Sequence, residues 1–287
     1  MVLSGTHADS RRPDRAGTSK ISLVHLSPVS ETLVVPLWAR SVESRRSDGV
    51  LHDPAAERIF ARLDYDFAKF RDGSVSQLTA CLRAQTVDRW VTTFLEASPR
   101  GTIVELGAGL DTRFERLDNG SATWFELDLP DVIALRRRLF RQRRRRQFMA
   151  MSVTEPGWIE PVRQATGPLF FVAEGLLMYL QEHEVRTLLS RLADHFPDSQ
   201  LAFDAFSPVI ADNLAWHDTM RHMRSAFTWS IDDITNIERW DRRYRLVDCV
   251  DMADFSEHFG RLPFHQQMLI WMLQYTWTYG VNLLRFG

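Results

Sequence analysis

The sequence is poor in cysteine: its 287 residues include only Cys81 and Cys249. Two thiols so far apart are not the disulfide framework of a small secreted domain, so a reducing, cytoplasmic compartment is the expected setting. Histidines, cysteines and carboxylates also do not group at the spacings of a metal site, and we therefore expect no bound metal.

Long apolar runs are missing too. No stretch reaches the length of a membrane span, and the N-terminus has charges but no apolar segment of a signal peptide. Residues 1–20 are rich in Ser, Gly, Pro and Arg, which predicts a disordered tail. The formal net charge is -2 and the isoelectric point about 6.5. No global field therefore recruits nucleic acid or an anionic membrane, and we expect neither as a partner.

Residues 21–100 show a helical pattern. The stretches 30–46, 53–63 and 75–97 carry apolar residues at helical spacing. Ser30 is a candidate N-cap, and Pro36 must end, kink or start a helix.

After Gly101 the pattern changes to alternating strands and helices. Strands are predicted at 102–107, 123–129, 147–153, 168–174, 200–206, 245–252 and 281–286. Helices are predicted at 131–144, 156–165 and 182–196, and from about residue 264. This order predicts an α/β, Rossmann-like fold with a seven-stranded, mostly parallel sheet and helices on both faces. Residues 21–287 are expected to form one domain, with 21–100 as an N-terminal helical lid.

The first predicted strand runs into a glycine-rich turn, VELGAGLDTRF at 104–114. Gly107 and Gly109 let the backbone turn tightly and let a ligand lie against bare peptide. Asp128 ends the next predicted strand, 21 residues after Gly107, where an acid can accept hydrogen bonds from ribose hydroxyls. The pattern therefore predicts a nucleoside cofactor at these two strand ends.

Two cofactors fit that geometry, a nicotinamide dinucleotide and S-adenosylmethionine. A dinucleotide site wants a third small residue where this chain has Thr112, and Asp111 would face the pyrophosphate. A sulfonium ligand is cationic and has no phosphate, so nearby carboxylates suit it. S-adenosylmethionine is favoured, and a nicotinamide oxidoreductase is the disfavoured alternative.

Five stretches together resemble the leucine carboxyl methyltransferase family, in particular its bacterial branch of polyketide O-methyltransferases of the tetracenomycin type. They are ETLVVPLWARSVESRRSDGVLHDPAA, VELGAGLDTRFERL, FELDLPDVIALRRRL, FVAEGLLMYL and FTWSIDDITNIERW. The resemblance implies a class I methyltransferase that uses S-adenosylmethionine in secondary-metabolite or antibiotic biosynthesis.

The resemblance also implies roles for single residues. Arg83 matches the arginine that pairs with the donor's methionyl carboxylate, Asp128 the acid on the ribose, and Glu174 an acid near the donor's amino end. Ser152 and Val153 fall where the family contacts adenine, and Arg40 is a second basic contact. The full set expected to bind the donor is Arg40, Arg83, Glu105, Gly107, Ala108, Gly109, Asp128, Leu129, Ser152, Val153, Glu174 and Gly175.

The acceptor is expected to be a carboxyl or phenolic oxygen of a small molecule. A carboxylate is already ionised at neutral pH and needs no base, whereas a phenol would profit from one. His217, His222 and His265 are then the candidate bases.

The acceptor pocket is expected around the insertion at 206–240. Aromatic residues in or near it suit a flat acceptor, although aromatics at such spacings also fill cores. The candidates are Tyr179, Phe206, Trp216, Phe227 and Trp229.

Other interpretations stay open. The same fold could methylate nitrogen, sulfur or a protein carboxyl group, or the chain could be a catalytically silent scaffold. The arginine-rich run at 136–148 is interpreted as a solvated face, or as a docking site for an acidic carrier protein that delivers the acceptor. The aromatic cluster Trp271, Tyr275, Trp277 and Tyr279 indicates helix packing or a homodimer face.

Overall fold

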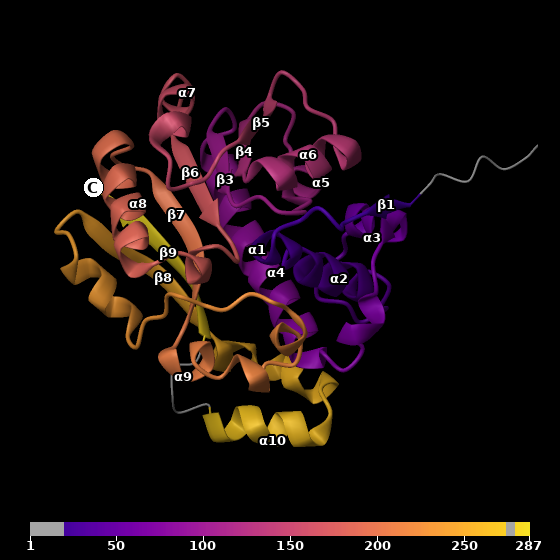
Figure 1. The fold of residues 1–287 in the computed structure, drawn as a ribbon. Coiled ribbons are helices and arrows are strands. Elements are labelled where there is room, and N and C mark those ends of the chain that lie inside the picture. Colours follow the sequence, from indigo (N-terminus) through magenta and orange to yellow (C-terminus); the bar gives the residue numbers. More distant parts are fainter. Residues whose placement is uncertain (1–19, 274–278) are drawn as a thin grey trace, which may run out of the picture.

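The computed structural model describes residues 20–273 and 279–287 (Figure 1). The tail predicted at 1–20 therefore lies outside the described residues, apart from Lys20. The division of 21–287 into a lid, a core and an insertion stays a prediction.

A seven-stranded sheet forms the centre of the molecule (Figure 1). Its spatial order is β5-β4-β3-β6-β7-β9-β8; β3 to β7 run parallel, and β9 is antiparallel to both of its neighbours. The predicted mostly parallel sheet is thereby confirmed. The strands are β3 (Thr102–Leu106), β4 (Thr123–Asp128), β5 (Arg146–Ala150), β6 (Leu169–Ala173), β7 (Gln200–Phe206), β8 (Tyr244–Asp251) and β9 (Tyr279–Phe286), and a separate pair is β1 (Ile21–Ser22) with β2 (Leu63–Asp64).

The helices follow the predicted pattern closely. The α-helices are α1 (Pro28–Glu31), α2 (Val34–Glu43), α3 (Pro54–Arg62), α4 (Ser74–Ala97), α5 (Arg113–Leu117), α6 (Pro130–Leu139), α7 (Ile159–Arg163), α8 (Glu182–His195), α9 (Pro208–Ala211) and α10 (Phe264–Leu273). Short 3₁₀ helices are η1 (Phe67–Phe70), η2 (Pro156–Trp158), η3 (Leu177–Tyr179), η4 (Leu214–Trp216), η5 (Met220–His222), η6 (Ile234–Arg239) and η7 (Met252–Arg261).

Three local expectations at the helices need correction or completion. Ser30 caps no helix; Ser27 is the N-cap of α1 and accepts a hydrogen bond from the Ser30 amide. Pro36 lies in the first turn of α2, where its missing N–H costs no helical hydrogen bond, so it starts the helix. The helix predicted at 131–144 ends at Leu139, because the chain turns there towards β5.

Alternate residues of the central strands fill two different cores. Val104, Phe125 and Phe171 point to the face covered by α7 and α8. Ile103 and Trp124 point to the opposite face, which α4 covers. Strands that are apolar on both faces give the continuous apolar runs seen in the sequence, because both faces of a parallel sheet are buried.

The arginine-rich run is not simply a solvated face, and that expectation is wrong for two of its members. Arg136 and Arg146 are 0% and 2% exposed. Both bind the buried carboxylate of Glu126 in β4: Arg136 through Nε (3.1 Å) and Nη2, and Arg146 through Nε at 2.7 Å. The two arginines therefore fasten α6 and the start of β5 onto β4.

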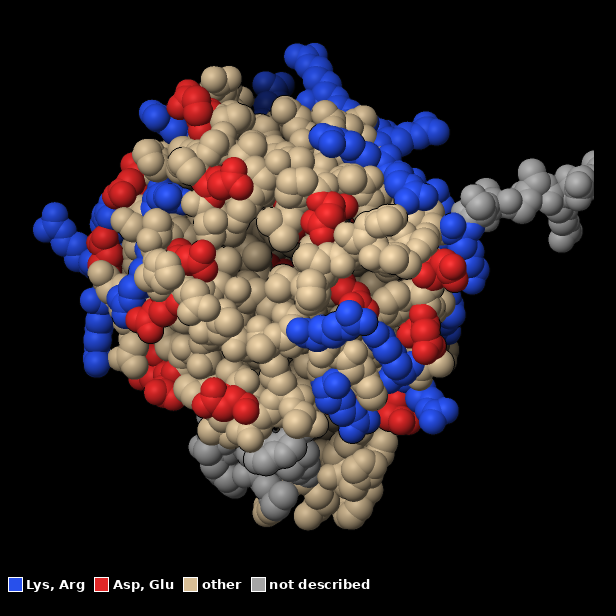
Figure 2. Space-filling view, viewed as in Figure 1, with Lys and Arg blue, Asp and Glu red and all other residues tan. Residues whose placement is uncertain are grey.

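The exposed arginines of the run lie elsewhere. Arg137 and Arg138 are on the outer side of α6, and Arg141, Arg143 and Arg144 follow in the loop that enters β5. Figure 2 shows basic side chains gathered over this region. The loop lies at the amino end of β5, away from the carboxyl ends of the strands.

Replacing Glu126 by Gln should lower the free energy of unfolding by about 1–3 kcal/mol, the range for losing hydrogen bonds to charged groups. Urea unfolding followed by circular dichroism measures the change. Glu182→Gln is the control, since its pair with Arg186 is on the surface and should count for less than about 1 kcal/mol. Equal effects of the two variants would contradict the structural role of Glu126.

None of the helices in residues 20–273 and 279–287 combines the length and the apolar character needed to cross a bilayer.

Candidate functional site

A cavity of about 900 Å³ opens at the carboxyl ends of the parallel strands. Its walls are mostly apolar, and they come from the ends of β3, β4, β6 and β7, from α1, α2 and α4, and from the segment after β7. In an open α/β sheet, ligands bind at this edge, next to the point where the strand order reverses. Here the order reverses at β3, which lies between β4 and β6.

The glycine-rich turn after β3 forms the floor of this cavity. Gly107 has φ +68°, and a Cβ there would lie 2.9 Å from Cδ1 of Leu176. Any larger residue would be strained by its backbone and crowded by its neighbour. The Gly109 amide donates to Oδ2 of Asp128 at 2.6 Å, so the ends of β3 and β4 are joined directly.

Asp128 is the acid at the end of β4. Its Oδ1 accepts the amide of Leu129 at 2.7 Å. Burial raises the pKa of this carboxyl to about 6, although the amides of Gly109 and Leu129 favour its ionised form. A carboxyl group with this pKa changes charge within about one pH unit of neutrality.

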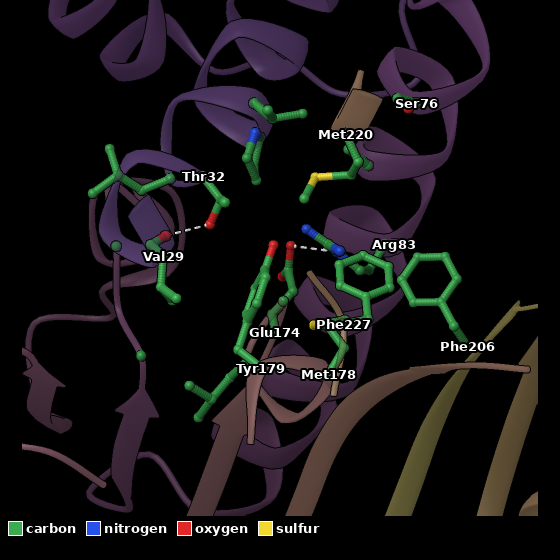
Figure 3. Close-up of a pocket in the computed structure, with 18 of the residues that line it drawn as sticks. Val29, Thr32, Ser76, Arg83, Glu174, Met178, Tyr179, Phe206, Met220 and Phe227 are labelled. Atoms are coloured by element: carbon green, nitrogen blue, oxygen red, sulfur yellow. Dashed lines mark hydrogen bonds and ion pairs between the residues drawn. The ribbon is translucent and has the colours of Figure 1, made fainter. Parts of the chain in front are cut away.

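Arg83, on α4, reaches the cavity between two carboxylates. Its Nε donates to Oε1 of Glu174 at 2.9 Å, and its Nη1 donates to Oδ2 of Asp204 at 2.8 Å. The Nη2 atom makes neither contact and lies beside Gly175, 3.5 Å from the place of a Cβ there. The Tyr279 hydroxyl also interacts with the Arg83 guanidinium. Glu174, Asp204 and Tyr279 therefore hold Arg83 in the cavity wall, where its guanidinium can reach a ligand (Figure 3).

Glu105, in β3, is buried without a hydrogen bond to either carboxylate oxygen among the described residues. The nearest cation, Nη1 of Arg113, is 3.7 Å away. Arg113 already donates to Asp88, Asp111 and Glu174, each at 2.6 Å. Burial and the charge of Asp111 raise the pKa of Glu105 well above its usual range. The cavity wall therefore contains a carboxyl group that lacks a hydrogen-bond partner within the described ranges.

Two of the residues predicted to bind the methyl donor already have hydrogen-bond partners within the protein. Both oxygens of Glu174 are taken, by Arg83 and Arg113. Arg40 binds Asp53 at 3.1 Å and the Leu110 carbonyl at 2.9 Å. Both residues line the cavity, but the hydrogen bonds seen in the structure join them to other residues of the protein.

The charge of Asp111, which seemed to disfavour a dinucleotide cofactor, is compensated by neighbouring arginines. Its carboxylate binds Arg113 at 2.6 Å and lies 3.6 Å from Arg116. These arginines hold the pKa of Asp111 far below its usual range despite burial. Because its charge is compensated, Asp111 excludes a dinucleotide less strongly than the sequence suggested.

The remaining predicted donor residues also lie around the cavity. All twelve line it, including Ala108, Leu129, Ser152 and Val153. Their contacts with a ligand stay predictions.

A second part of the cavity wall, next to these polar residues, is aromatic. Phe206 and Phe227 stack with ring centroids 4.9 Å apart, and Tyr279 lies 4.6 Å from Phe206. Tyr179 meets Phe227 edge-on at 5.5 Å. Figure 3 shows Phe227 beside Arg83, Phe206 next to Phe227, and Tyr179 beside Glu174.

Some predicted acceptor residues lie elsewhere. Trp229 is 3% exposed and packs in the core against Trp240, outside the cavity lining, so we withdraw it from the acceptor site. His222 is exposed, accepts a hydrogen bond from Arg221, and does not line the cavity. The side chain of Trp216 is outside the described part of the structure. His217 and His265 do line the cavity.

Asp204 and Tyr279 belong to the site although the sequence did not place them there. Asp204 is fully buried and accepts hydrogen bonds from Arg83, from the Gly175 amide (2.6 Å) and from the Tyr279 hydroxyl (3.1 Å). A charged residue inside the apolar strand QLAFDAF was the available signal. Tyr279 begins β9 and lines the cavity instead of extending a helix; Tyr275 and Trp277 lie outside the described residues.

No group of three or more His, Cys, Asp or Glu side chains in the described ranges is arranged to hold a metal ion.

Comparison with known proteins places these features in a family. The model of the leucine carboxyl methyltransferase family matches residues 34–193, more than half of the chain. The tetracenomycin polyketide synthesis O-methyltransferase TcmP of Streptomyces glaucescens is 32% identical over 238 residues, 80% of this chain and 88% of TcmP. The S-adenosyl-L-methionine-dependent methyltransferase dpfgK of Gibberella zeae is 29% identical over 75% of this chain and 79% of its own.

The fold has a solved counterpart as well. A DUF574 family protein from Streptomyces avermitilis superimposes with a TM-score of 0.58 at 13% identity, over 91% of this chain and all of its own. This likeness concerns the fold alone. The matched family residues include the turn after β3, Asp128 and Glu174, which border the cavity. The chain belongs to the leucine carboxyl methyltransferase family and is an S-adenosylmethionine-dependent methyltransferase.

Proposed function

We propose that the chain methylates an oxygen, carboxyl or phenolic, of a small aromatic metabolite of the polyketide kind. One observation carries the proposal: a single cavity joins the polar donor end, at Gly107 and Asp128, to the aromatic wall of Phe206 and Phe227. Flat rings suit an aromatic wall. The name of TcmP, a polyketide O-methyltransferase, supports the same acceptor class.

The residues at the polar end fit the donor's functional groups. The Arg83 guanidinium is placed to bind the donor's carboxylate. Glu105, whose oxygens have no hydrogen-bond partner among the described residues, can accept hydrogen bonds from the donor's ammonium group. Asp128 is placed to accept the ribose hydroxyls, while the bare backbone of Gly107 leaves room for the nucleoside. The donor supplies an electrophilic methyl group. The chain's part is to hold the acceptor oxygen in line with it and to exclude water.

A methylation assay tests the proposal. The protein is incubated with S-adenosylmethionine and, separately, with 2-naphthoate, anthraquinone-2-carboxylate and 2-naphthol, and the methyl ester or ether is detected by mass spectrometry. Methylation of at least one probe, reduced at least tenfold in Phe206→Ala, is expected. Donor binding without methylation of any of the three would argue against an aromatic oxygen acceptor.

The raised pKa of Asp128 makes its contribution to donor affinity depend on pH. The ionised form accepts ribose hydroxyls best, and it is lost as pH falls through about 6. At pH 8, Asp128→Asn should weaken donor binding at least about tenfold, the scale of a charge-assisted hydrogen bond. At pH 5 the protonated Asp128 resembles Asn, so the ratio of the two dissociation constants should fall towards one.

Calorimetry of S-adenosylmethionine binding to both proteins at pH 5, 6, 7 and 8 measures this ratio. Using the ratio removes the contribution of other titrating groups, such as Glu105, that both proteins share. A ratio that stays constant from pH 5 to 8 would place the ribose away from Asp128.

Location and partners are also proposals. Cys81 and Cys249 are free thiols, in keeping with a reducing, cytoplasmic compartment. A small-molecule acceptor is the proposed partner. Delivery by a carrier protein through the arginine-rich run draws little support from the structure, since the exposed arginines lie at the amino end of β5 and the cavity lies at the opposite end of the strands.

A further inference from the structure

The segment after β7 is fastened to the start of α4 by one carboxylate. Oδ2 of Asp218 accepts the amides of Val75 (3.0 Å) and Ser76 (3.2 Å) in the first turn of that helix. The Ser76 hydroxyl donates to Oδ1 of the same carboxylate. Free amides at a helix start are commonly satisfied by such acceptors, here supplied from about 140 positions away in the sequence. The neighbouring His217 is thereby held at a fixed place in the cavity wall.

The hydrogen bonds around His217 define which ring nitrogen carries the proton. The Met220 amide donates to Nδ1 at 3.3 Å. The hydroxyls of Ser76 and Thr219 are also near Nδ1, at 3.3 and 3.4 Å, but their protons are used elsewhere: Thr219 donates to Ser76, and Ser76 donates to Asp218. Oδ1 of Asp218 also faces Nδ1, but at 3.7 Å it is beyond hydrogen-bond distance, and the Met220 amide is the nearer partner. A nitrogen that accepts an amide proton has none of its own. In the neutral ring the proton is therefore on Nε2.

Two facts make this Nε2–H group available to a ligand. No described residue forms a hydrogen bond with Nε2, and the ring lines the cavity. The ring stands edge-on to Phe206 and Phe227, with centroids 6.2 and 6.5 Å away, beside the proposed acceptor wall. Burial lowers the pKa of His217, although Asp218 opposes the shift, so the ring is neutral at neutral pH.

We propose that His217 donates its Nε2 proton in a hydrogen bond to the oxygen group of the acceptor and does not remove a proton from it. This inference rests on the proposed function, and it reverses the role of general base that the sequence suggested for His217. A ring protonated on Nε2 has no lone pair directed at the acceptor, whereas its N–H suits an anionic oxygen.

The inference narrows the acceptor class. An oxygen that binds as an anion has no proton to lose on methylation, so it needs no base. Tyr179 does not supply one, because burial raises the pKa of its hydroxyl to about 12. We therefore expect acceptors whose oxygen is ionised before binding: a carboxylic acid, or a phenol made acidic by a neighbouring carbonyl.

Nuclear magnetic resonance tests the tautomer without any acceptor. Long-range ¹H–¹⁵N spectra of ¹⁵N-histidine-labelled protein at pH 8 distinguish Nε2–H from Nδ1–H, and the His217 signals are assigned by their loss in His217→Gln or, if that variant does not fold, in His217→Asn. We expect Nε2–H, retained in Ser76→Ala because the Met220 amide still binds Nδ1. An Nδ1–H ring, or a cationic ring at pH 8, would overturn the inference whether or not the chain is a methyltransferase.

Kinetics with a methylated probe tests the role. His217→Leu should raise KM for the acceptor about tenfold or more, the effect of losing a hydrogen bond to a charged group, while kcat changes less and its pH profile keeps the same shape. His222→Gln, on the exposed side of η5, is the control and should change neither constant. If His217→Leu instead lowers kcat by a factor of about 100 or more and removes a pH-dependent limb, the residue is a base.

Discussion

Replacing Arg83 by Ala should raise the dissociation constant for S-adenosylmethionine at least about tenfold and lower the free energy of unfolding by about 3–5 kcal/mol. The loss of affinity is expected because the Arg83 guanidinium lines the cavity and is proposed to bind the methionyl carboxylate. The loss of stability is expected because Glu174 and Asp204, 7% and 0% exposed at their side chains, would each lose a cationic partner.

Two further variants separate these effects. Arg83→Lys keeps the charge but cannot reach both carboxylates and a ligand at once, so it should retain more stability than Arg83→Ala and still bind the donor weakly. Arg285→Ala removes an exposed arginine that pairs with Asp198 at 3.3 Å, and should cost less than about 1 kcal/mol. Calorimetry and urea unfolding measure both quantities. Donor affinity within twofold of the original protein in Arg83→Lys and Arg83→Ala would remove Arg83 from the donor site.

Replacing Arg113 by Ala should destabilise the protein by about 3–5 kcal/mol, the cost of leaving buried carboxylates without their partner. Arg113 is fully buried and donates to Asp88, Asp111 and Glu174, which come from α4, from the turn after β3 and from the end of β6. One side chain therefore connects three elements that border the cavity.

The loss of stability in Arg113→Ala should also depend on pH and should be smaller at low pH. Arginines depress the pKa of Asp111 and Glu174 in the folded protein, so the stability they contribute is present above the ordinary carboxyl range and declines as pH falls. Both depressed pKa values lie below 5, so the original protein keeps these two charges from pH 8 to pH 5. In Arg113→Ala, burial is no longer balanced by this cation and raises the two carboxyl pKa values, so the variant can take up protons in this range. Urea unfolding at pH 8 and pH 5 should therefore show a smaller difference between variant and original protein at pH 5. An equal or larger difference at pH 5 would contradict the electrostatic origin of the effect.

The sheet could be predicted because its signals are local. The central strands β3, β4, β6 and β7 are short runs that are buried on both faces, and the turn at Gly107 and the acid at Asp128 lie directly at strand ends. Strand ends at one edge meet without any knowledge of side-chain packing. The donor half of the cavity was therefore accessible from the sequence.

The ionic network was not predictable in the same way. Arg83 binds carboxylates 91 and 121 positions further along the chain, and Glu126 binds arginines from a run that looks solvent-exposed. Periodicity shows that Asp204 lies in a buried strand but not which cation meets it. Only the folded chain decides which member of an arginine run turns inward.

The acceptor half was predicted least well, for a related reason. Trp229 and Phe206 are both aromatic, and both lie in or beside the predicted insertion, yet one fills the core and the other lines the cavity. Burial and ligand contact select the same residue types, so sequence cannot separate them. The role of His217 depends on the amide of Met220, three residues away, and on Ser76 in a distant helix.

A crystal structure of the protein with S-adenosylhomocysteine, the demethylated donor, tests the central claim most directly. We expect the nucleoside across the turn of Gly107, its ribose hydroxyls on Asp128, its carboxylate on the Arg83 guanidinium and its sulfur facing the aromatic wall. A ligand bound outside this cavity, or a ribose with no contact to Asp128, would contradict it.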